Sequence, residues 1–466
     1  MLSYLPKYFT TRAIILYIII LIICALVFPR PLPFVWVVFG LLAVIPFFYY
    51  GASLSLKWMF LPEKTFIKKV FYTALIIRLI YVFFIYFFYM AQTGESFDFV
   101  AGDSKWYHGL SIRLKNYLFS GNMDTFQAVR EELGVSDQGF PMYLTLLSII
   151  FGEGVLIPRI LNALFSAWMT ILIYKIAVRN FDERVGKIAA ILSMLLPNFI
   201  YYTGVHLKET LMVFLLVAFA ERADAMIREK TIRFVTFLWV ALLGLSLFYF
   251  RTVLGAAAVF SFASAILFTK GRVMERSKRF VGLFWILILG IIIASSAITQ
   301  DLNKYMEGKE TNQDMSLFQK TRRGQSLAQY GSRAVFLPMI LVAPFPTLVN
   351  TDQPDIMMRN GAMFTRNVYA FFVILALILI LKRKLVRLYV LILVFLLSYL
   401  FILASSAFAI SERFHMPVLP FLTIFAAYGI TQINQRNQRY FLPYLILIGV
   451  AIIGWNWFKL AGRGVL

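Results

Sequence analysis

The sequence predicts an all-α, polytopic membrane protein, and two observations carry this prediction. Hydrophobic residues make up 61% of the 466 residues and aromatic residues 17%, and the mean hydropathy is +0.78, which is far too apolar for a soluble protein of this length. Apolar stretches of about 17 to 22 residues recur along the chain, and a helix of that length crosses a hydrocarbon core of about 30 Å. Such stretches must be helical, because lipid offers no partners to unpaired backbone groups.

We predict about 13 membrane-spanning helices. The first follows Lys7 and Arg12 as the core of a signal peptide would, but it lacks a small-residue cleavage site and a second span follows closely, so we expect a retained anchor. The single cysteine, Cys24, lies in this first span, which excludes an intrachain disulfide. The predicted spans lie near residues 13–29, 34–51, 70–91, 155–178, 188–204, 209–222, 234–250, 252–269, 280–298, 367–382, 385–404, 416–434 and 440–458.

The net charge of +22 is explained by membrane topology. Lysines and arginines gather in links on one side of the predicted spans, for example at 57–69, 179–187 and 382–387. The positive-inside rule puts these links in the cytoplasm, where they face anionic lipid. We therefore expect membrane lipids and no nucleic acid as partners. The expected location is the inner (cytoplasmic) membrane, with the active site facing the periplasm or exterior.

The apolar segment 334–350 contains three prolines and is the hardest to place. If it crossed the membrane, the basic cluster at 382–387 would be external, so we expect a re-entrant or surface-lying segment on the outer face. Two long external segments result, 92–154 and 299–366. The first contains DSKWYHGLSIRLKNYLF, whose apolar residues recur at three- and four-residue spacing, which predicts amphipathic helices lying on the membrane. We find no repeat or linker, so residues 1–466 form a single integral domain.

The first external segment carries the carboxylates best suited to chemistry. Asp98 and Asp103 lie in FDFVAGDSKWYHGL, directly after a predicted span. Ionisable groups at a bilayer edge are costly and therefore indicate function. Partial desolvation raises the basicity of a carboxylate, so either residue is a candidate general base. The alternative is a solvated loop in which Asp103 caps the helix that follows.

Other polar residues map to the external ends of predicted spans. Lys208 and Glu209 in VHLKETL are suited to holding a phosphate and a sugar hydroxyl or metal, and the alternative is a wetted turn. Arg413 opens a late span, where it either binds substrate or anchors the interface. The full set of candidates for substrate binding is Lys208, Arg413, His415, Tyr107, His108 and Arg251.

The three histidines are candidate metal ligands. His108, His206 and His415 all map to external ends of spans, and imidazole is a common zinc ligand. Their spacing matches no zinc motif, so we predict no metal site and no certain cofactor, although a divalent metal stays an alternative.

Several motifs in this order resemble the GT-C superfamily of integral-membrane glycosyltransferases, in the branch that contains protein O-mannosyltransferases and lipid A aminoarabinose transferases. The motifs are GDSKWYHGLS, QGFPMYLTLLSIIFGEG, IPRILNALFSAW, LLPNFIYYTGVHLKETL and ERFHMPVLPFLTIFAAYG. The resemblance covers roughly residues 70–435. Residues 1–69 would then be two additional transmembrane helices, and 436–466 would add a C-terminal one.

The resemblance implies an enzyme that moves a sugar from a polyprenyl-phosphate donor to a glycan, lipid or protein acceptor in cell-envelope glycan biosynthesis. It implies Asp103, with Asp98 as the second candidate, as the catalytic carboxylate and Glu209 as the second acid, while Lys208 and Arg413 contact the donor phosphate. The chain departs from the pattern in its two extra N-terminal spans, in having Glu rather than Asp as second acid, and in lacking a DxD in the first loop.

Physical chemistry is compatible with this reading. A polyprenyl phosphate leaves with negative charge, which cations at the bilayer edge stabilise, and one base with direct displacement gives inversion at the anomeric carbon. Two other classes compete. A polysaccharide polymerase or O-antigen ligase would depend on paired arginines. A lipid or glycan transporter should show inverted repeats and broken helices near the membrane midplane, and we detect no such repeat in the sequence.

Overall fold

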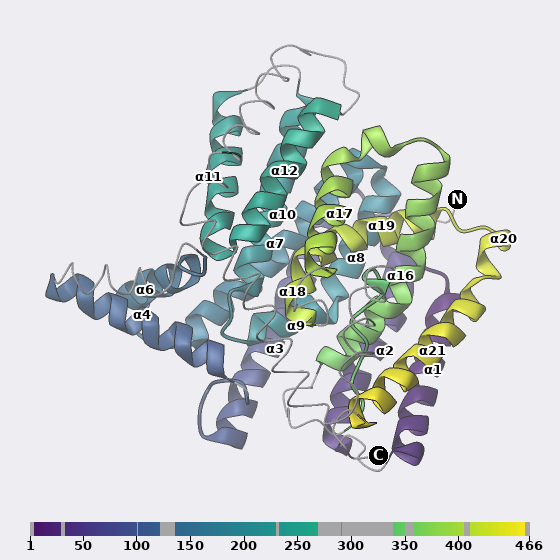
Figure 1. Cartoon of the computed structure of the whole chain (residues 1–466), viewed down its shortest axis with the longest axis horizontal. Helices are drawn as coiled ribbons and strands as arrows, with labels where there is room; N and C mark the ends of the chain where they lie inside the picture. Colours follow the sequence, from purple (N-terminus) through teal and green to yellow (C-terminus); the bar gives the residue numbers. More distant parts are fainter. Residues whose placement is uncertain are drawn as a thin grey trace.

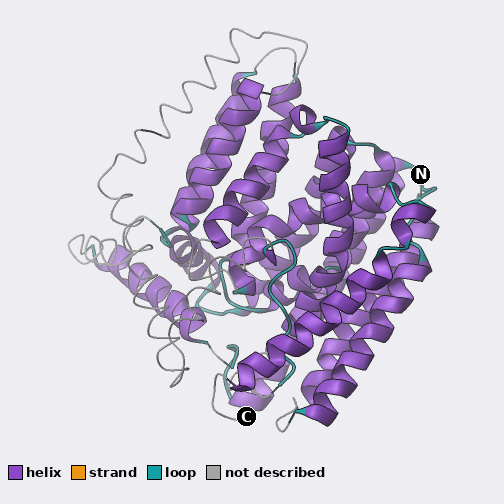
Figure 2. Ribbon diagram, turned by 45° about the vertical axis from the view of Figure 1, so that its right-hand side comes forward, coloured by secondary structure: helices purple, strands orange, loops and turns teal. Residues whose placement is uncertain are grey.

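The computed structural model describes residues 4–28, 33–99, 101–121, 136–229, 233–268, 290, 339–349, 358–404 and 411–461. Within these ranges the chain forms helices joined by short links and no β-strand (Figures 1 and 2), so the all-α prediction is confirmed. The helices are α1 (Lys7–Val27), α2 (Phe34–Trp58), α3 (Glu63–Thr93), α4 (Gly102–Ser120), α6 (Gly139–Phe151), α7 (Leu156–Asn180), α8 (Glu183–Leu195), α9 (Pro197–Gly204), α10 (Glu209–Arg228), α11 (Phe234–Phe250), α12 (Thr252–Phe268), α16 (Arg359–Lys382), η1 (Val386–Leu388), α17 (Val390–Ala404), α18 (Glu412–His415), η2 (Met416–Val418), α19 (Leu419–Thr431), α20 (Gln435–Gln438) and α21 (Phe441–Ala461).

The bundle is that of a multi-pass membrane protein. In the described part of the chain, seven helices are long and apolar enough to cross a membrane, and the bent pair α8–α9 is an eighth if it counts as one span. Helices α11, α12 and α17 coincide with predicted spans but have 17, 17 and 15 residues, a rise of roughly 22 to 26 Å. The predicted span 280–298 lies outside the described residues except for Gly290. The count of 13 spans stays a prediction.

The predicted span 188–204 is broken rather than straight. Helices α8 and α9 meet at an angle of 42°, and Pro197 opens the second of them. Proline has no N–H to offer the carbonyl four residues earlier, so the Ser193 carbonyl needs another donor. The buried guanidinium of Arg78, on α3, donates to the carbonyls of Ser193 and Met194, each at 3.2 Å. A buried side chain of α3 therefore supplies the hydrogen bonds that the backbone loses at the bend.

Helices α4 and α6 pack against each other and project from one side of the bundle (Figure 1). The helix predicted after Asp103 is present. However, it begins at Gly102, its N-cap is Ala101, and no side chain caps it. The capping interpretation of Asp103 is therefore wrong, because its side chain is engaged elsewhere.

The described part of the proline-rich segment, residues 339–349, is irregular and largely buried, so it does not lie on the surface. Side chains from α16 and α21 satisfy its backbone. The Asn456 amide accepts from Leu348 N at 2.6 Å and donates to Pro346 O at 3.1 Å, and Asn360 bonds both backbone groups of Thr347. Irregular backbone is tolerated inside the bundle because protein groups replace water.

Candidate functional site

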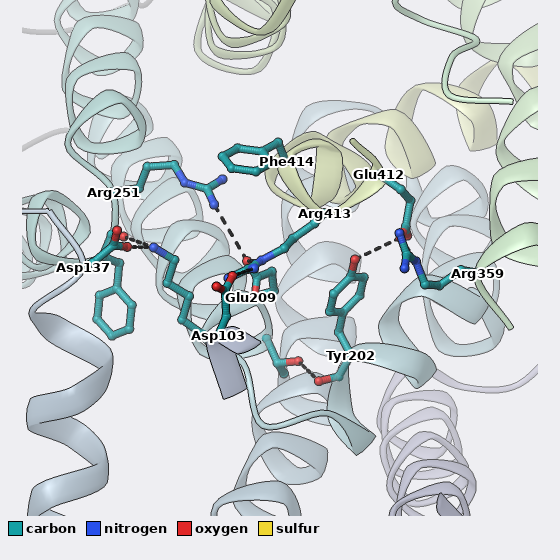
Figure 3. Close-up of polar contacts among 12 residues, drawn as sticks. Asp103, Asp137, Tyr202, Glu209, Arg251, Arg359, Glu412, Arg413 and Phe414 are labelled. Atoms are coloured by element: carbon teal, nitrogen blue, oxygen red, sulfur yellow. Dashed lines mark hydrogen bonds and ion pairs between the residues drawn. The ribbon is translucent and has the colours of Figure 1, made fainter. Parts of the chain in front are cut away.

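The site is organised by α18, a single helical turn late in the chain. Its first two residues, Glu412 and Arg413, direct their side chains to opposite sides (Figure 3). Each joins a separate cluster of charged and polar groups, contributed by helices that begin or end at this place. Two neighbouring residues of α18 therefore connect parts of the chain that are far apart in sequence.

The first cluster surrounds Arg413. Its Nε donates to Glu209 Oε1 at the start of α10, and its Nη1 donates to Asp103 Oδ2 in the first turn of α4. Glu209 is wholly buried, whereas the Asp103 side chain is 61% exposed. Arg251 lies behind this pair, with Nη2 3.8 Å from Glu209 Oε1 and its guanidinium carbon 4.3 Å from the ring centre of Phe414. Glu209 is thus a buried anion shared by two arginines, and Asp103 is the carboxylate that faces solvent.

The second cluster surrounds Glu412, which is 2% exposed. Its carboxylate accepts from Tyr202 Oη at 2.9 Å and from Asn198 Nδ2, both on α9. Arg359, the first residue of α16, completes the cluster with Nε 3.6 Å from Glu412 Oε2. The sequence analysis did not select these residues. Glu412 directly precedes Arg413 in SERFH, and that acidic residue at the start of an apolar span was the available signal.

A cavity of about 290 Å³ lies between the clusters and receives groups from both. Arg413, Arg359 and Asp103 all reach it, so two cations and one exposed carboxylate meet in one space. The cavity is lined by Asp98, Gly102, Asp103, Ser104, Tyr201, Tyr202, Leu207, Arg359, Ser411 and Arg413.

Asp98 and Asp103 share this cavity but differ in surroundings. Asp98 is 7% exposed, and its Oδ1 accepts from Ser104 Oγ at 2.7 Å, which ties the incoming chain to the first turn of α4. Asp103 contacts Arg413 and otherwise faces solvent. Asp103 is therefore the better placed of the two to meet a substrate, while Asp98 has a local structural role.

Lys208 does not line the cavity. Its side chain is buried, so the wetted-turn alternative is wrong. Its Nζ donates to Phe250 O at 3.0 Å and pairs with Asp137, in the link before α6, while the ring of Tyr107 lies 6.0 Å away. Burial raises the pKa of the Tyr107 phenol. These contacts join the projecting helices α4 and α6 to the end of α11.

Two of the histidines meet in an aromatic cluster. The ring centres of His108 and His206 are 5.5 Å apart, and Phe97 and Phe140 pack beside them. Burial, followed by the positive charges of Arg159 and His108, lowers the pKa of His206 well below its usual value. Burial also lowers the pKa of His108. His415 belongs to α18, and no group of three potential metal ligands occurs in the described residues.

An apolar groove of about 400 Å³ is lined in part by the same segments as the polar cavity. Consecutive residues face the two spaces: Ile200 lines the groove and Tyr201 the cavity, and Met358 lines the groove and Arg359 the cavity. The groove is lined by Phe39, Leu42, Ala43, Pro46, Tyr50, Ile77, Ile80, Tyr81, Phe84, Leu195, Pro197, Ile200 and Met358. It runs between α2, α3 and the α8–α9 bend.

The fold thus defines a helical multi-pass membrane protein with a charged cavity beside an apolar groove. A comparison with protein-family models and with curated proteins finds no match to the chain.

Proposed function

We propose that the protein is a GT-C-type glycosyltransferase that takes a sugar from a polyprenyl-phosphate donor. The observation that carries this proposal is that the apolar groove and the charged cavity are lined by consecutive residues of the same two segments, Ile200 and Tyr201 on α9 and Met358 and Arg359 at the start of α16. A lipid-linked phosphate needs an apolar path for its chain and cations for its headgroup. A base beside those cations is needed for transfer to an acceptor, and Asp103 is the exposed carboxylate there.

The proposed reaction is a direct displacement at the anomeric carbon. The lipid chain lies in the groove, and the donor phosphate takes the Nη1 of Arg413 from Asp103, the more exposed of its two carboxylate partners. Glu209 remains as the buried counter-charge. Asp103, released from the arginine, accepts the proton of the acceptor hydroxyl. The acceptor oxygen bonds to the anomeric carbon as the bond to the phosphate oxygen breaks, and the electron pair leaves with the polyprenyl phosphate, which Arg413 stabilises.

The remaining assignments follow from this scheme. The acceptor is a glycan, lipid or protein hydroxyl at the external face of the cytoplasmic membrane. We leave Lys208 out of the phosphate site, because its ammonium is bound to Asp137 and Phe250 O outside the cavity. Arg251 acts through Glu209 and not on the substrate.

The test uses the protein in nanodiscs with a polyprenyl-phosphate sugar and a cell-envelope extract as the source of acceptors. Release of polyprenyl phosphate is followed by mass spectrometry. Ile80→Trp, which fills the groove from α3, should lower donor affinity about tenfold or more, since a large added side chain in a fitted apolar space excludes its ligand. Ile76→Trp is the matched control, because Ile76 lies one turn earlier on the same helix, is 55% exposed against 65% for Ile80, and does not line the groove.

No release from the wild-type protein with any polyprenyl-phosphate sugar would refute the enzyme assignment. Equal donor affinity in the Ile80 and Ile76 variants would remove the groove from the donor site.

A further inference from the structure

The Arg359–Glu412 pair has no place in the reaction as described so far. Arg359 starts α16 and reaches the cavity wall that faces Arg413, with 25% of its side chain exposed. Arg413 is shared between Glu209 and Asp103, two carboxylates that an incoming phosphate must partly displace. The Arg359–Glu412 contact of 3.6 Å is longer than a hydrogen bond and is an ion pair, so Glu412 holds the guanidinium at the cavity wall by charge.

The surroundings of Glu412 suit a residue that positions the Arg359 guanidinium. A buried carboxylate is stable only when its charge is compensated and its oxygens accept hydrogen bonds. Asn198 and Tyr202 supply the hydrogen bonds from α9, and Arg359 supplies the positive charge. Glu412 does not line the cavity. It reaches the cavity contents only through Arg359.

A guanidinium is well suited to the ligand proposed for this space. Arginine stays charged and presents several N–H donors in a plane, which matches the oxygens of a phosphate. Two arginines in the lining of one cavity would hold the phosphate of the donor and later the charge of the leaving group. Arg413 contacts the proposed base, Asp103. Arg359 directly follows Met358, which lines the groove.

Resting on the proposed function, we propose that Arg359 is the second phosphate-binding cation of the donor site and that Glu412 is its positioning residue. Glu412 holds the guanidinium between α9 and α16, so that it meets the phosphate at the part of the cavity wall that follows Met358 of the groove.

The test measures binding, without sugar transfer. Polyprenyl phosphate without a sugar, and polyprenol of the same length, are titrated into nanodisc-embedded protein and read by native mass spectrometry. Arg359→Gln should weaken polyprenyl phosphate binding about 10-fold or more, the usual loss for a hydrogen bond to a charged group, and leave polyprenol binding unchanged. Arg359→Lys should retain part of the affinity. Arg113→Gln, which removes an exposed charge on α4 outside the cavity, should bind both lipids as the wild type does.

Glu412→Gln keeps the shape and the acceptor for Asn198 but removes the charge. It should weaken polyprenyl phosphate binding in the wild-type background and have no further effect in the Arg359→Gln background, because it acts through that arginine. An equal loss in both backgrounds would make Glu412 merely structural and overturn its positioning role.

Equal binding of polyprenyl phosphate by the wild type and a folded Arg359→Gln variant would overturn the inference. Binding that depends on Arg359 supports it even if no sugar is ever transferred, in which case only the proposed enzyme function fails.

Discussion

At the scale of single residues, burial separates the roles of four carboxylates around one cavity. Glu209 and Glu412 are buried and compensate arginines, Asp98 is buried and accepts a local hydrogen bond, and Asp103 is exposed. A base must reach its substrate, so exposure and not sequence spacing distinguishes Asp103 from Asp98.

Asp103→Asn should lower donor turnover about 100-fold or more, the usual worth of a positioned base. The amide keeps the shape of the side chain but cannot take a proton. Asp98→Asn is the matched control, since an amide oxygen still accepts from Ser104. Turnover is measured as release of polyprenyl phosphate, with donor binding as the check on folding. Near-normal turnover in Asp103→Asn with a severe defect in Asp98→Asn would reverse the two assignments.

His206 gives the folded protein a pH dependence of known sign. Burial lowers its pKa, and the groups that face it are Phe97, Phe140, His108 and Arg159. Between the folded pKa and the unfolded value of about 6.5, the unfolded state binds the extra proton. The contribution of His206 to stability should therefore be full above about pH 6.5 and fall on acidification, by up to about 1.4 kcal/mol per pH unit.

The melting temperature in detergent should accordingly drop between pH 7.5 and 5.5. His206→Phe, which suits the aromatic cluster, should make that drop smaller. The same drop in the variant as in the wild type would exclude His206 as its source.

At the scale of elements, the α8–α9 bend places the cavity wall. Pro197 ends one helix and starts the next at 42°, and the second helix carries Tyr201 and Tyr202 to the cavity and Asn198 to Glu412. Removing the cause of the bend should therefore displace the site while the helices persist.

Pro197→Ala restores an N–H that can bond the Ser193 carbonyl. We expect turnover to fall about 10- to 100-fold, since displacements of about 1 Å at a site cost that much, with no loss of melting temperature. Pro443→Ala, in the first turn of α21 and remote from the cavity, serves as the control. Full activity in Pro197→Ala would show that other contacts hold the bend.

The sequence predicts where the helices lie better than it predicts which distant residues contact each other. Hydropathy placed the helices well, and α11 has the predicted bounds of 234–250, because an apolar run marks a span without knowledge of its neighbours. It missed the bend, since apolar residues continue through Pro197. It also missed Glu412 and Arg359. Their partners lie far along the chain, as with Asn198 and Glu412, which are 214 residues apart, and no local pattern encodes such a contact.

Of the site residues predicted from the sequence, some reach the cavity and others do not. Arg413 and Asp103 were selected for their position at span ends, and the structure brings them together. Lys208 and Arg251 were selected for the same reason, but they contact protein groups outside the cavity wall. The residue type and span end were available from the sequence, whereas the direction of the side chain depends on packing.

At the scale of the whole molecule, the charged cavity lies where α9 ends and α10 and α16 begin. Basic residues lie at the opposite ends of α10 and α16, with Arg228 and Lys382 in their last turns. Ser120 at the end of α4 and Gln435 at the start of α20 are exposed residues at these two ends.

Ser120→Cys should react with a membrane-impermeant thiol reagent in intact cells, and Gln435→Cys should react only after permeabilisation. The native Cys24 is 1% exposed and should give little background. Labelling is read by the mass shift of the purified protein. The opposite labelling pattern would reverse the proposed topology and place the cavity on the cytoplasmic side.

The two hydrogen bonds of Asn456 to the backbone of Pro346 and Leu348 set an order for the folding of the new chain. About 110 residues separate the two parts, so the ribosome must deliver α21 before these backbone groups find their partners. Until then the Leu348 N–H and the Pro346 carbonyl need water, although Asn360 of α16 can already bond Thr347. A nascent chain stopped before α21 should therefore leave these two backbone groups without Asn456 as their partner.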